Sequence, residues 1–443
     1  MMQTLQQLQS GKLKGLKELK LACNLTEFPK EIIDLSDTLE VLDLSNNLLS
    51  ELPDDFSKLK KLRIAFFSNN LFTILPTILY DCPRLTMIGF KSNQIKTIPE
   101  KSLPITTRWL ILTNNQIEKI PDSIGDCDKL QKVAFAGNKI KALPESMSNC
   151  KKLELLRISA NQLNEIPDWL LHLPRLSWLA FSGNPCSFKS VFSEELTEIH
   201  WSTLQLNKIL GEGASGVISK ATLTNKSLQK EDVAVKIFKG EVTSDGYPQD
   251  EMKTFIAAGK HQNLVPLKGK VTGHEEFKEG LVLELIPPNY KVLGNPPSMD
   301  SCTRDVYHSD LQFTIAQTLS ILIGVASAVK HLHDKGILHG DLYAHNTLVN
   351  EDAHAYFGDF GAATFYDKKN KSNAELLERI EVRAFGCLME DLIERVIVEP
   401  KYLKVSTSLT DLKESCLIED VLKRKKFEQI HFFLEEFSTF ISK

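Results

Sequence analysis

Asparagine recurs along the first half of the chain at a nearly constant interval, and this period constrains the fold more than any other feature of the sequence. The interval is 23 residues, once 22, and the positions are Asn24, Asn47, Asn70, Asn93, Asn115, Asn138, Asn161 and Asn184. Around each of them runs the pattern L-x-x-L-x-L-x-x-N-x-L, and a proline follows shortly after the first seven. A period of this length indicates stacked units, each too small to bury its own apolar face.

The pattern resembles the leucine-rich repeat and covers about residues 13 to 188. The resemblance implies an α/β solenoid with one short parallel strand per repeat, leucines facing inward, and each Asn side chain bonded to the backbone of the next coil. We therefore expect a leucine-rich-repeat domain of eight repeats over residues 1–188. A linker over 189–203 and a second domain over 204–443 follow.

The strand positions between the inward leucines are predicted to line a concave surface. This surface is unusually apolar over the third to fifth repeats, at Ile64, Phe66, Met87, Trp109 and Ile111. Exposed apolar patches of this kind mark interaction sites, so we expect the patch to bind a protein partner or to pack on the second domain. The alternative is that these side chains only shield one another on a tightly curved sheet.

Two short stretches in the second half carry the residue types of a phosphoryl-transfer site. Residues 339–346 read His-Gly-Asp-Leu-Tyr-Ala-His-Asn, and Asp-Phe-Gly follows at 359–361. An Asp with an Asn five positions later puts a proton acceptor and a metal ligand on one short loop. Upstream, residues 204–223 alternate like two strands around a glycine-rich turn, whose backbone can approach phosphate oxygens closely. A glycine string alone is weak, because dinucleotide-binding folds also use one, but there it precedes a helix rather than a strand.

In this order the motifs resemble the eukaryotic-type protein kinases, which implies an α+β bilobal domain that uses ATP and Mg²⁺. The resemblance implies that Asp341 accepts or orients the substrate hydroxyl, while Asn346 and Asp359 hold magnesium ions. It also implies that Lys236, on the apolar strand 233–236, contacts a phosphate and a helix carboxylate. We expect that carboxylate to be Glu251.

Asp250 is the competing carboxylate, and we favour Glu251 because it shares a helix face with Phe255, one turn later. The resemblance also implies nucleotide contacts for a glycine loop and for the backbone that follows the strand 281–286. These contacts are assigned to Gly211, Gly213, Gly216, Val217, Lys236, Glu284 and Ile286. His339 is expected to be structural and to pack against Phe360.

The chain departs from the kinase pattern at several positions. Gly340 stands where many of these kinases have the Arg that grips a phosphorylated activation loop, so control by such phosphorylation is not expected. Tyr343 replaces the Lys of serine/threonine kinases, and His345 falls where tyrosine kinases have an Arg. Glu381 stands at the usual position of an Asp, and the stretch before that helix is short, with no Ala-Pro-Glu. Losing one preorganised contact costs ~10²–10³ in rate, which predicts a slow enzyme.

The resemblance as a whole implies a protein kinase, similar to soluble bacterial-type kinases with the same layout. We expect it to transfer the ATP γ-phosphate to a Ser or Thr hydroxyl of a protein, with the repeats selecting the partner. One alternative is a pseudokinase scaffold that binds nucleotide without turnover, which the short segment favours. Another is phosphorylation of a small molecule.

Composition and charge narrow the setting in which the protein works. The formal net charge of −4 offers no broad basic face, so nucleic acid is not an expected partner. The N-terminus lacks the apolar core of a signal peptide, and no later run approaches the ~20 apolar residues of a membrane span. We therefore expect a cytoplasmic protein.

Overall fold

The computed structural model describes residues 3–188, 196–213, 215–240 and 242–441. Its contacts divide the chain into two compact units. The first unit comprises Met1–Leu176 and Asn184–Cys186. The second comprises Ser177–Gly183 and Ser187–Lys443, so a short segment of the eighth repeat groups with the C-terminal half.

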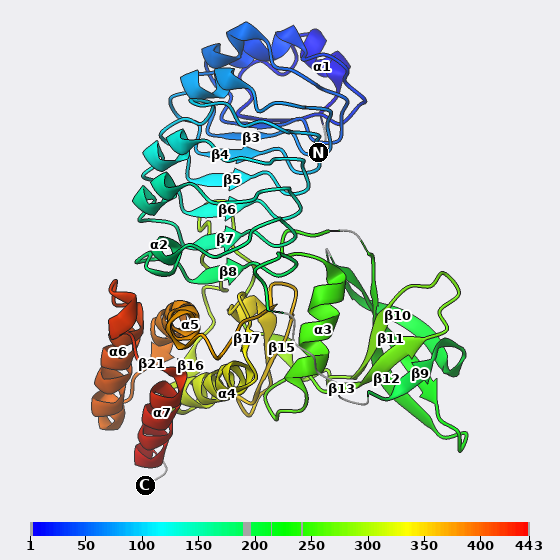
Figure 1. Ribbon diagram of the computed structural model, residues 1–443, viewed down its shortest axis with the longest axis vertical. Helices are drawn as coiled ribbons and strands as arrows, with labels where there is room; N and C mark the ends of the chain where they lie inside the picture. Colours follow the sequence, from blue (N-terminus) through cyan, green and yellow to red (C-terminus); the bar gives the residue numbers. More distant parts are fainter. Residues whose placement is uncertain (1–2, 189–195, 214, 241, 442–443) are drawn as a thin grey trace. The chain divides into compact units, whose positions relative to one another are not determined.

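Three-residue parallel strands run through the repeat region (Figure 1), which confirms the solenoid expected from the period. In chain order they are β1 (Glu18–Lys20), β2 (Val41–Asp43), β3 (Ile64–Phe66), β4 (Met87–Gly89), β5 (Trp109–Ile111), β6 (Lys132–Ala134), β7 (Leu155–Arg157) and β8 (Trp178–Ala180). Short helices return the chain between strands: η1 (Lys30–Leu35), η2 (Asp54–Lys58), η3 (Thr77–Asp81), η4 (Asp122–Asp126), η5 (Glu145–Asn149) and α2 (Asp168–Leu171). Each of these begins directly after a repeat proline, whose fixed φ suits the N-terminus of a helix. One further helix, α1 (Leu5–Gln9), precedes β1.

The repeat asparagines hold the turns that leave the strands. Asn47 Oδ1 accepts hydrogen bonds from the amides of Cys23 and Leu25, both 3.0 Å long, and Nδ2 donates to Leu21 O at 2.8 Å. These partners lie on the preceding coil, so the expectation of bonds to the next coil was wrong. Asn24 differs from the others, since it is exposed with φ 56°. It opens the series, and the described residues before it form α1 and β1 rather than an earlier repeat that could receive such bonds.

A six-stranded sheet forms one part of the second unit, in the order β10-β11-β12-β14-β13-β9. The strands are β9 (Glu198–His200), β10 (Leu204–Glu212), β11 (Gly216–Thr224), β12 (Lys230–Phe238), β13 (Leu267–Thr272) and β14 (Gly280–Glu284), with helix α3 (Pro248–Ala258) beside them (Figure 1). Its core is built from β-branched side chains, among them Val233, Val235 and Val282. Strand β9 lies in the expected linker, whose residues 189–195 fall outside the described residues, and pairs in parallel with β13.

Helices dominate the rest of the second unit, which agrees with the expected bilobal α+β kinase-like fold. They are α4 (Ile315–Asp334), α5 (Lys371–Ile393), α6 (Leu403–Leu417) and α7 (Phe427–Ile441). Short strand pairs join β15 (Lys291–Val292) and β19 (Ala355–Phe357) to β18 (Thr347–Val349), β16 (Phe313–Thr314) to β21 (Val396–Ile397), and β17 (Ile337–Leu338) to β20 (Thr364–Phe365). Single helical turns are η6 (Trp201–Thr203), η7 (Ala344–Asn346), η8 (Pro400–Tyr402) and η9 (Val421–Lys423).

Helix α4 is the core helix of this helical part. Among the described residues it alone is long and apolar enough to cross a membrane, by length and composition. Most of it is buried inside the protein, where it packs on α7 and β19. Burial of this kind explains its apolar composition as that of a core helix.

Candidate active site

An ion pair joins the central sheet to helix α3. Lys236 lies on β12 between Ile218 of β11 and Leu281 of β14, and its Nζ pairs with Oε1 of Glu251. Glu251 is 2% exposed, whereas Asp250 instead pairs with Lys253 on the surface. The structure therefore joins Lys236 to Glu251 rather than to Asp250, as expected.

The pKa of the Glu251 carboxyl is raised above its ordinary value. Burial is the largest cause, the positive charge of Lys236 opposes it, and the negative charge of Asp359 adds to it. The influence of Asp359 shows that the Asp-Phe-Gly turn lies near this pair. A Cβ built on Gly361 would be 3.2 Å from Asp359 Oδ1 and 4.0 Å from Glu251 Oε2.

A row of rings connects α3 to the loop that carries Asp341. Phe255 packs on Phe360 with ring centroids 4.7 Å apart, and Phe360 packs on His339 at 5.3 Å. His339 is fully buried, burial lowers its pKa, and its Nε2 donates to Gly358 O at 3.0 Å. His339 is thus a neutral structural residue packed against Phe360, as the sequence predicted.

Hydrogen bonds tie Asp341, Asn346 and the Asp-Phe-Gly turn together. Asn346 Nδ2 donates to Asp341 Oδ2 at 2.7 Å and to its backbone oxygen at 2.9 Å. The amide of Gly358 donates to Asn346 O at 3.0 Å. Asp359 itself is exposed and has φ 59°, and its Oδ1 accepts from the amide of Gly361 at 3.1 Å. The side chains expected to act together therefore lie on two connected loops.

The glycine-rich turn between β10 and β11 has two kinds of glycine. A Cβ on Gly211 or Gly213 would meet nothing within 4 Å, whereas one on Gly216 would lie 2.5 Å from Ile237 O and 3.4 Å from Lys236 Cε. Gly216 is therefore required by its close packing against the backbone of Ile237, next to the Lys236 side chain. Gly211 and Gly213 leave open space beside the backbone, which is the room that phosphate oxygens need.

The described residues fit a magnesium nucleotide but not a metal ion alone. Asn346 and Asp359 offer oxygen ligands, which Mg²⁺ prefers. Among the described residues, no group of three or more His, Cys, Asp or Glu side chains could hold a metal ion. A metal at Asn346 and Asp359 would thus need phosphate oxygens to complete its ligand shell, as Mg²⁺ sites with few protein ligands do.

The remaining predicted contacts lie on strands β11 and β14 or just after β14. Val217 is half-buried at the start of β11. Glu284 ends β14 with an exposed side chain, and its amide donates to Pro266 O at 2.9 Å. Ile286 follows and is half-buried. Glu284 also lines an open hollow of about 1260 Å³ that does not include Lys236 or residues 339–346, the candidate catalytic loop, so this hollow is separate from the site.

Glu381 accepts hydrogen bonds from the backbone of the candidate catalytic loop, a role that its sequence position did not reveal. Its Oε1 accepts from the amide of Gly340 at 2.7 Å. Its Oε2 accepts from His333 Nε2 at 2.7 Å and from the amide of His339 at 3.3 Å. Burial works to raise the pKa of this carboxyl, but the hydrogen bond and charge of His333 lead the contacts that lower it overall. Glu381 is therefore ionised and saturated with donors.

Asp305 is a second residue that no motif pointed to. It accepts from the amide of His345 at 3.1 Å and from His345 Nδ1 at 2.7 Å. Burial works to lower the pKa of His345, but the Asp305 hydrogen bond and the charges of Asp341 and Asp359 raise it above its ordinary value. A positive charge is thereby favoured at His345, next to Asn346 in the loop.

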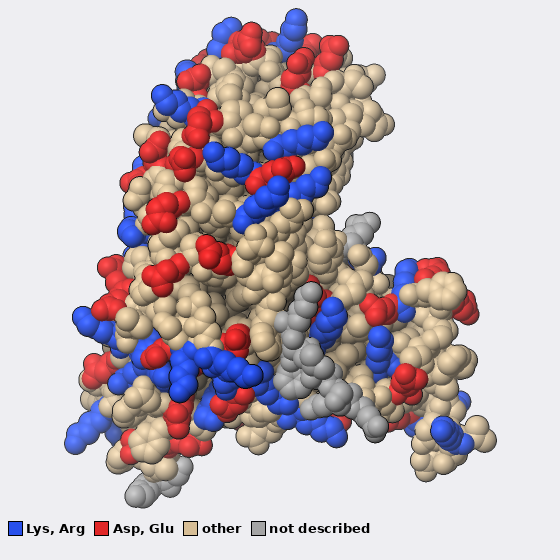
Figure 2. Space-filling view, in the orientation of Figure 1, with Lys and Arg blue, Asp and Glu red and all other residues tan. Residues whose placement is uncertain are grey.

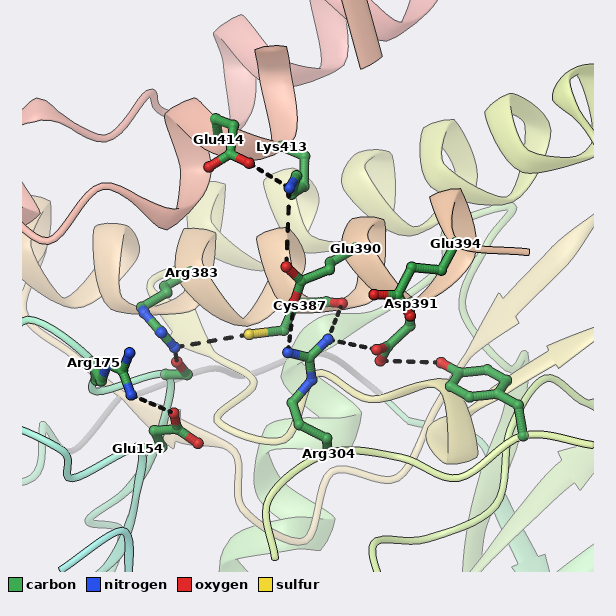
Figure 3. Close-up of polar contacts among 12 residues, drawn as sticks. Glu154, Arg175, Arg304, Arg383, Cys387, Glu390, Asp391, Glu394, Lys413 and Glu414 are labelled. Atoms are coloured by element: carbon green, nitrogen blue, oxygen red, sulfur yellow. Dashed lines mark hydrogen bonds and ion pairs between the residues drawn. The ribbon is translucent and has the colours of Figure 1, made fainter. Parts of the chain in front are cut away.

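A charged cluster fixes the segment that carries Asp305. Arg304 donates to the carboxylates of Glu390 and Asp391 and to the backbone oxygen of Cys387, all on α5 (Figure 3). Burial raises the pKa of Asp391 to about 6, although Arg304 opposes this shift. The cluster anchors the segment on the helix that also supplies Glu381.

The apolar residues of the predicted concave patch are largely covered. Two of them are buried, Ile64 and Met87, and three are half-buried, Phe66, Trp109 and Ile111. The ring of Phe66 covers Gly89, where an added Cβ would lie 2.7 Å from a ring carbon. The ammonium of Lys132 lies 4.3 Å from the centre of the Trp109 ring. These contacts favour mutual shielding for part of the patch.

Comparisons with known proteins agree with both halves of this description. The family model of protein tyrosine and serine/threonine kinases matches residues 204–393, and two leucine-rich-repeat models match residues 105–163 and 38–59. Ephrin type-A receptor 8 of Homo sapiens is 31% identical over 170 residues, 37% of this chain and 15% of that receptor. Ephrin type-B receptor 3 of Xenopus laevis is 28% identical over 176 residues, 38% of this chain and 16% of that receptor. The match thus spans about a sixth of each receptor. The chain consists of leucine-rich repeats followed by a protein tyrosine and serine/threonine kinase domain.

Proposed function

We propose that the protein is an ATP-dependent protein kinase that phosphorylates Ser or Thr hydroxyls of a protein substrate. The observation that carries this proposal is the convergence of the Lys236–Glu251 ion pair, Asp359 and the Asn346–Asp341 hydrogen bond. A purely structural domain has no need for a proton acceptor beside two oxygen ligands for a metal. The matched kinase model supports the same class of reaction.

Each residue of the site has a separate task in this proposal. Magnesium ATP, when bound, would supply the phosphoryl group, and the metal would offset the negative charge that develops on the phosphate oxygens. Lys236, which is paired with Glu251, orients the phosphates through its positive charge. The open space beside the backbone of Gly211 and Gly213 leaves room for the phosphate oxygens. Asp359 would hold a metal ion, as would Asn346 through its side-chain oxygen, since its Nδ2 is bonded to Asp341.

Asp341 orients the acceptor hydroxyl and takes its proton. The side-chain Nδ2 of Asn346 donates to one carboxylate oxygen of Asp341, Oδ2, at 2.7 Å and so fixes the orientation of that carboxylate. A preoriented acceptor lowers the entropic cost of reaching the transition state. Because the loop has Tyr343 where serine/threonine kinases have Lys, we propose a slow rate. Tyr343 is buried, so it cannot replace an ammonium group, while His345 offers a partial positive substitute.

We also propose that the repeats recognise a protein partner and that the protein works in the cytoplasm. The strand face keeps three half-buried apolar side chains, Phe66, Trp109 and Ile111, which a partner can cover. On the face drawn in Figure 2, Lys and Arg side chains are interspersed with Asp and Glu on both units. This mixed charge supports a protein partner over a nucleic acid.

The test uses the purified full chain, labelled ATP and Mg²⁺ with matched peptides that present Ser, Thr or Tyr. We expect label on Ser and Thr, and a rate about 100 to 1000 times lower for Asp341→Asn, the size typical of losing one key catalytic group. Label on Tyr alone would overturn the proposed acceptor. Nucleotide binding without transfer in the unaltered protein would instead establish a scaffold that binds nucleotide.

A further inference from the structure

Trp178 lies directly against the catalytic loop. It is 1% exposed, and its indole stacks on the ring of Tyr343 with centroids 4.5 Å apart and planes inclined by 6°. Its Nε1 donates to Leu342 O at 2.9 Å. Leu342 and Tyr343, the two residues that Trp178 contacts, directly follow Asp341 in the chain. One side chain thus holds the loop by a ring contact and by a backbone hydrogen bond.

The stack continues toward the reacting groups. Tyr343 lies against His345 with ring centroids 4.8 Å apart, and His345 is held from its other side by Asp305. The next residue is Asn346, which is bonded to Asp341. A displacement of the Trp178 ring would therefore be passed through closely packed groups to the proton acceptor.

Gly340 explains how closely the Trp178 segment approaches the loop. Gly340 has φ 73°, and a Cβ there would lie 2.6 Å from Leu179 O and 2.9 Å from Ala362 O. Any larger residue would push these two backbones apart. The departure from the kinase pattern at Gly340 therefore follows from the packing of Leu179, and an Arg at this position could not be accommodated.

Two further bonds hold the segment Ser177–Gly183 within the second unit. The amide of Phe181 donates to Thr364 Oγ1 at 3.4 Å, just after the Asp-Phe-Gly turn. Arg383 on α5 donates to Ser177 Oγ at 2.7 Å, and Figure 3 shows the same guanidinium directed at Cys387. Only residues 362–370 separate Gly361 from α5, so this kinase domain has little activation segment of its own to cover the loop.

We infer that Trp178 is a positioning residue of the kinase site, and that Ser177–Gly183 supports the catalytic loop where the short activation segment does not reach. This inference rests on the proposed function for its effect on turnover. Trp178 acts through Leu342 and Tyr343 and touches no reacting group. Its loss should lower kcat and leave the Lys236 side of the site, and hence nucleotide binding, unchanged.

The experiment compares Trp178→Phe and Trp178→Ala with the control Trp169→Phe, which replaces a half-buried tryptophan of α2 in the first unit. Trp178→Phe keeps a ring but removes the donor to Leu342 O. We expect kcat to fall about tenfold for Trp178→Phe, since a hydrogen bond of this kind is worth roughly one power of ten. Trp178→Ala should lower kcat about 100-fold or more, with KM for ATP within about twofold and the control unchanged.

A second measurement does not depend on turnover. Hydrogen exchange of the peptide covering residues 339–346 should become about tenfold faster in Trp178→Phe and stay unchanged in Trp169→Phe, because the lost bond holds this loop closed. Unaltered exchange together with unaltered kcat in a folded Trp178→Phe protein would overturn the inference. Faster exchange in a protein that shows no transfer at all would support the positioning role and overturn only the proposed activity.

Discussion

The repeats and the catalytic loop solve the same structural problem with different side chains. In each, irregular backbone is buried and its polar groups need partners. In the repeats a neutral amide supplies them, as when Asn115 accepts from Ile95 N at 2.9 Å and donates to Phe90 O at 2.9 Å. In the loop a carboxylate does so, since Glu381 accepts from Gly340 N, His339 N and His333.

The difference between the two regions lies in charge and in repetition. An asparagine side chain both donates and accepts, so it satisfies carbonyls as well as amides without carrying a charge. Glu381 only accepts, and a buried carboxylate is tolerated only when donors surround it. The repeats also spread the task over many equivalent coils, whereas the amides of both His339 and Gly340 rely on the single carboxylate of Glu381. We therefore expect the loop to be the more fragile of the two.

Replacement of Glu381 by Ala should have the largest effect on stability. The change removes the acceptor for two backbone amides and for His333, all of them buried. We expect the second unit to lose about 3–5 kcal/mol of stability, the cost of breaking a buried charged network from one side. Hydrogen exchange of the peptide 333–346 measures the loss, and peptides from β2 to β6 serve as the internal control.

Replacement of Asn115 by Ala should cost less and act only on the first unit. It leaves Ile95 N and Phe90 O without the partner they have now, at about 1–3 kcal/mol in total, because neighbouring coils remain intact. Exchange in peptides around residues 88–98 should rise, with the catalytic loop unchanged. A loss larger than that of Glu381→Ala would contradict the view that repetition makes the repeats robust.

The sequence predicted those parts of the fold that recur or that match a motif. The strands fall on the residues expected from the 23-residue period, and the structure pairs Lys236 with Glu251 and Asn346 with Asp341, all residues that the kinase pattern had singled out. In both cases spacing along the chain carries the information. The period could not reveal that Asn24 lies outside the set of bonded asparagines, because that depends on having a preceding coil.

Contacts between distant segments could not be predicted in this way. Trp178 and Asp305 belong to no catalytic motif, yet they bond to the loop backbone at Leu342 and to His345. The expected linker likewise contributes β9 to the sheet, since β13 had an edge open to pairing. The sequence shows that Gly340 replaces an Arg, but only the packing of Leu179 explains why.

The stability that Glu381 gives to the catalytic loop should depend on pH, because its carboxyl is charged, whereas the contribution of the neutral repeat asparagines should not. The folded pKa of Glu381 lies below its ordinary value of 4.5, so its stabilising contribution is complete above pH 4.5 and is lost as pH falls through the folded pKa. The stability difference between the unaltered protein and Glu381→Gln should therefore shrink below that pH, by about 1.4 kcal/mol for each unit of pKa depression. Denaturant titrations of both proteins from pH 7 to pH 3 measure it. A difference that grows on acidification would show that Glu381 is protonated in the folded loop.

Asn24→Gly should have the smallest effect on stability. It tests whether an asparagine of the 23-residue period stabilises the protein only when its side chain bonds to a preceding coil. Asn24 is exposed with φ 56°, a conformation that glycine adopts without strain, and its side chain is not one of those bonded across coils. We expect the first unit to change in stability by less than about 0.5 kcal/mol, as for ordinary surface positions. Denaturant unfolding of this variant beside Asn115→Gly is the measurement, because both proteins then gain the same backbone freedom. Equal losses in the two would mean that the period alone, and not bonding to a preceding coil, sets the contribution of each asparagine.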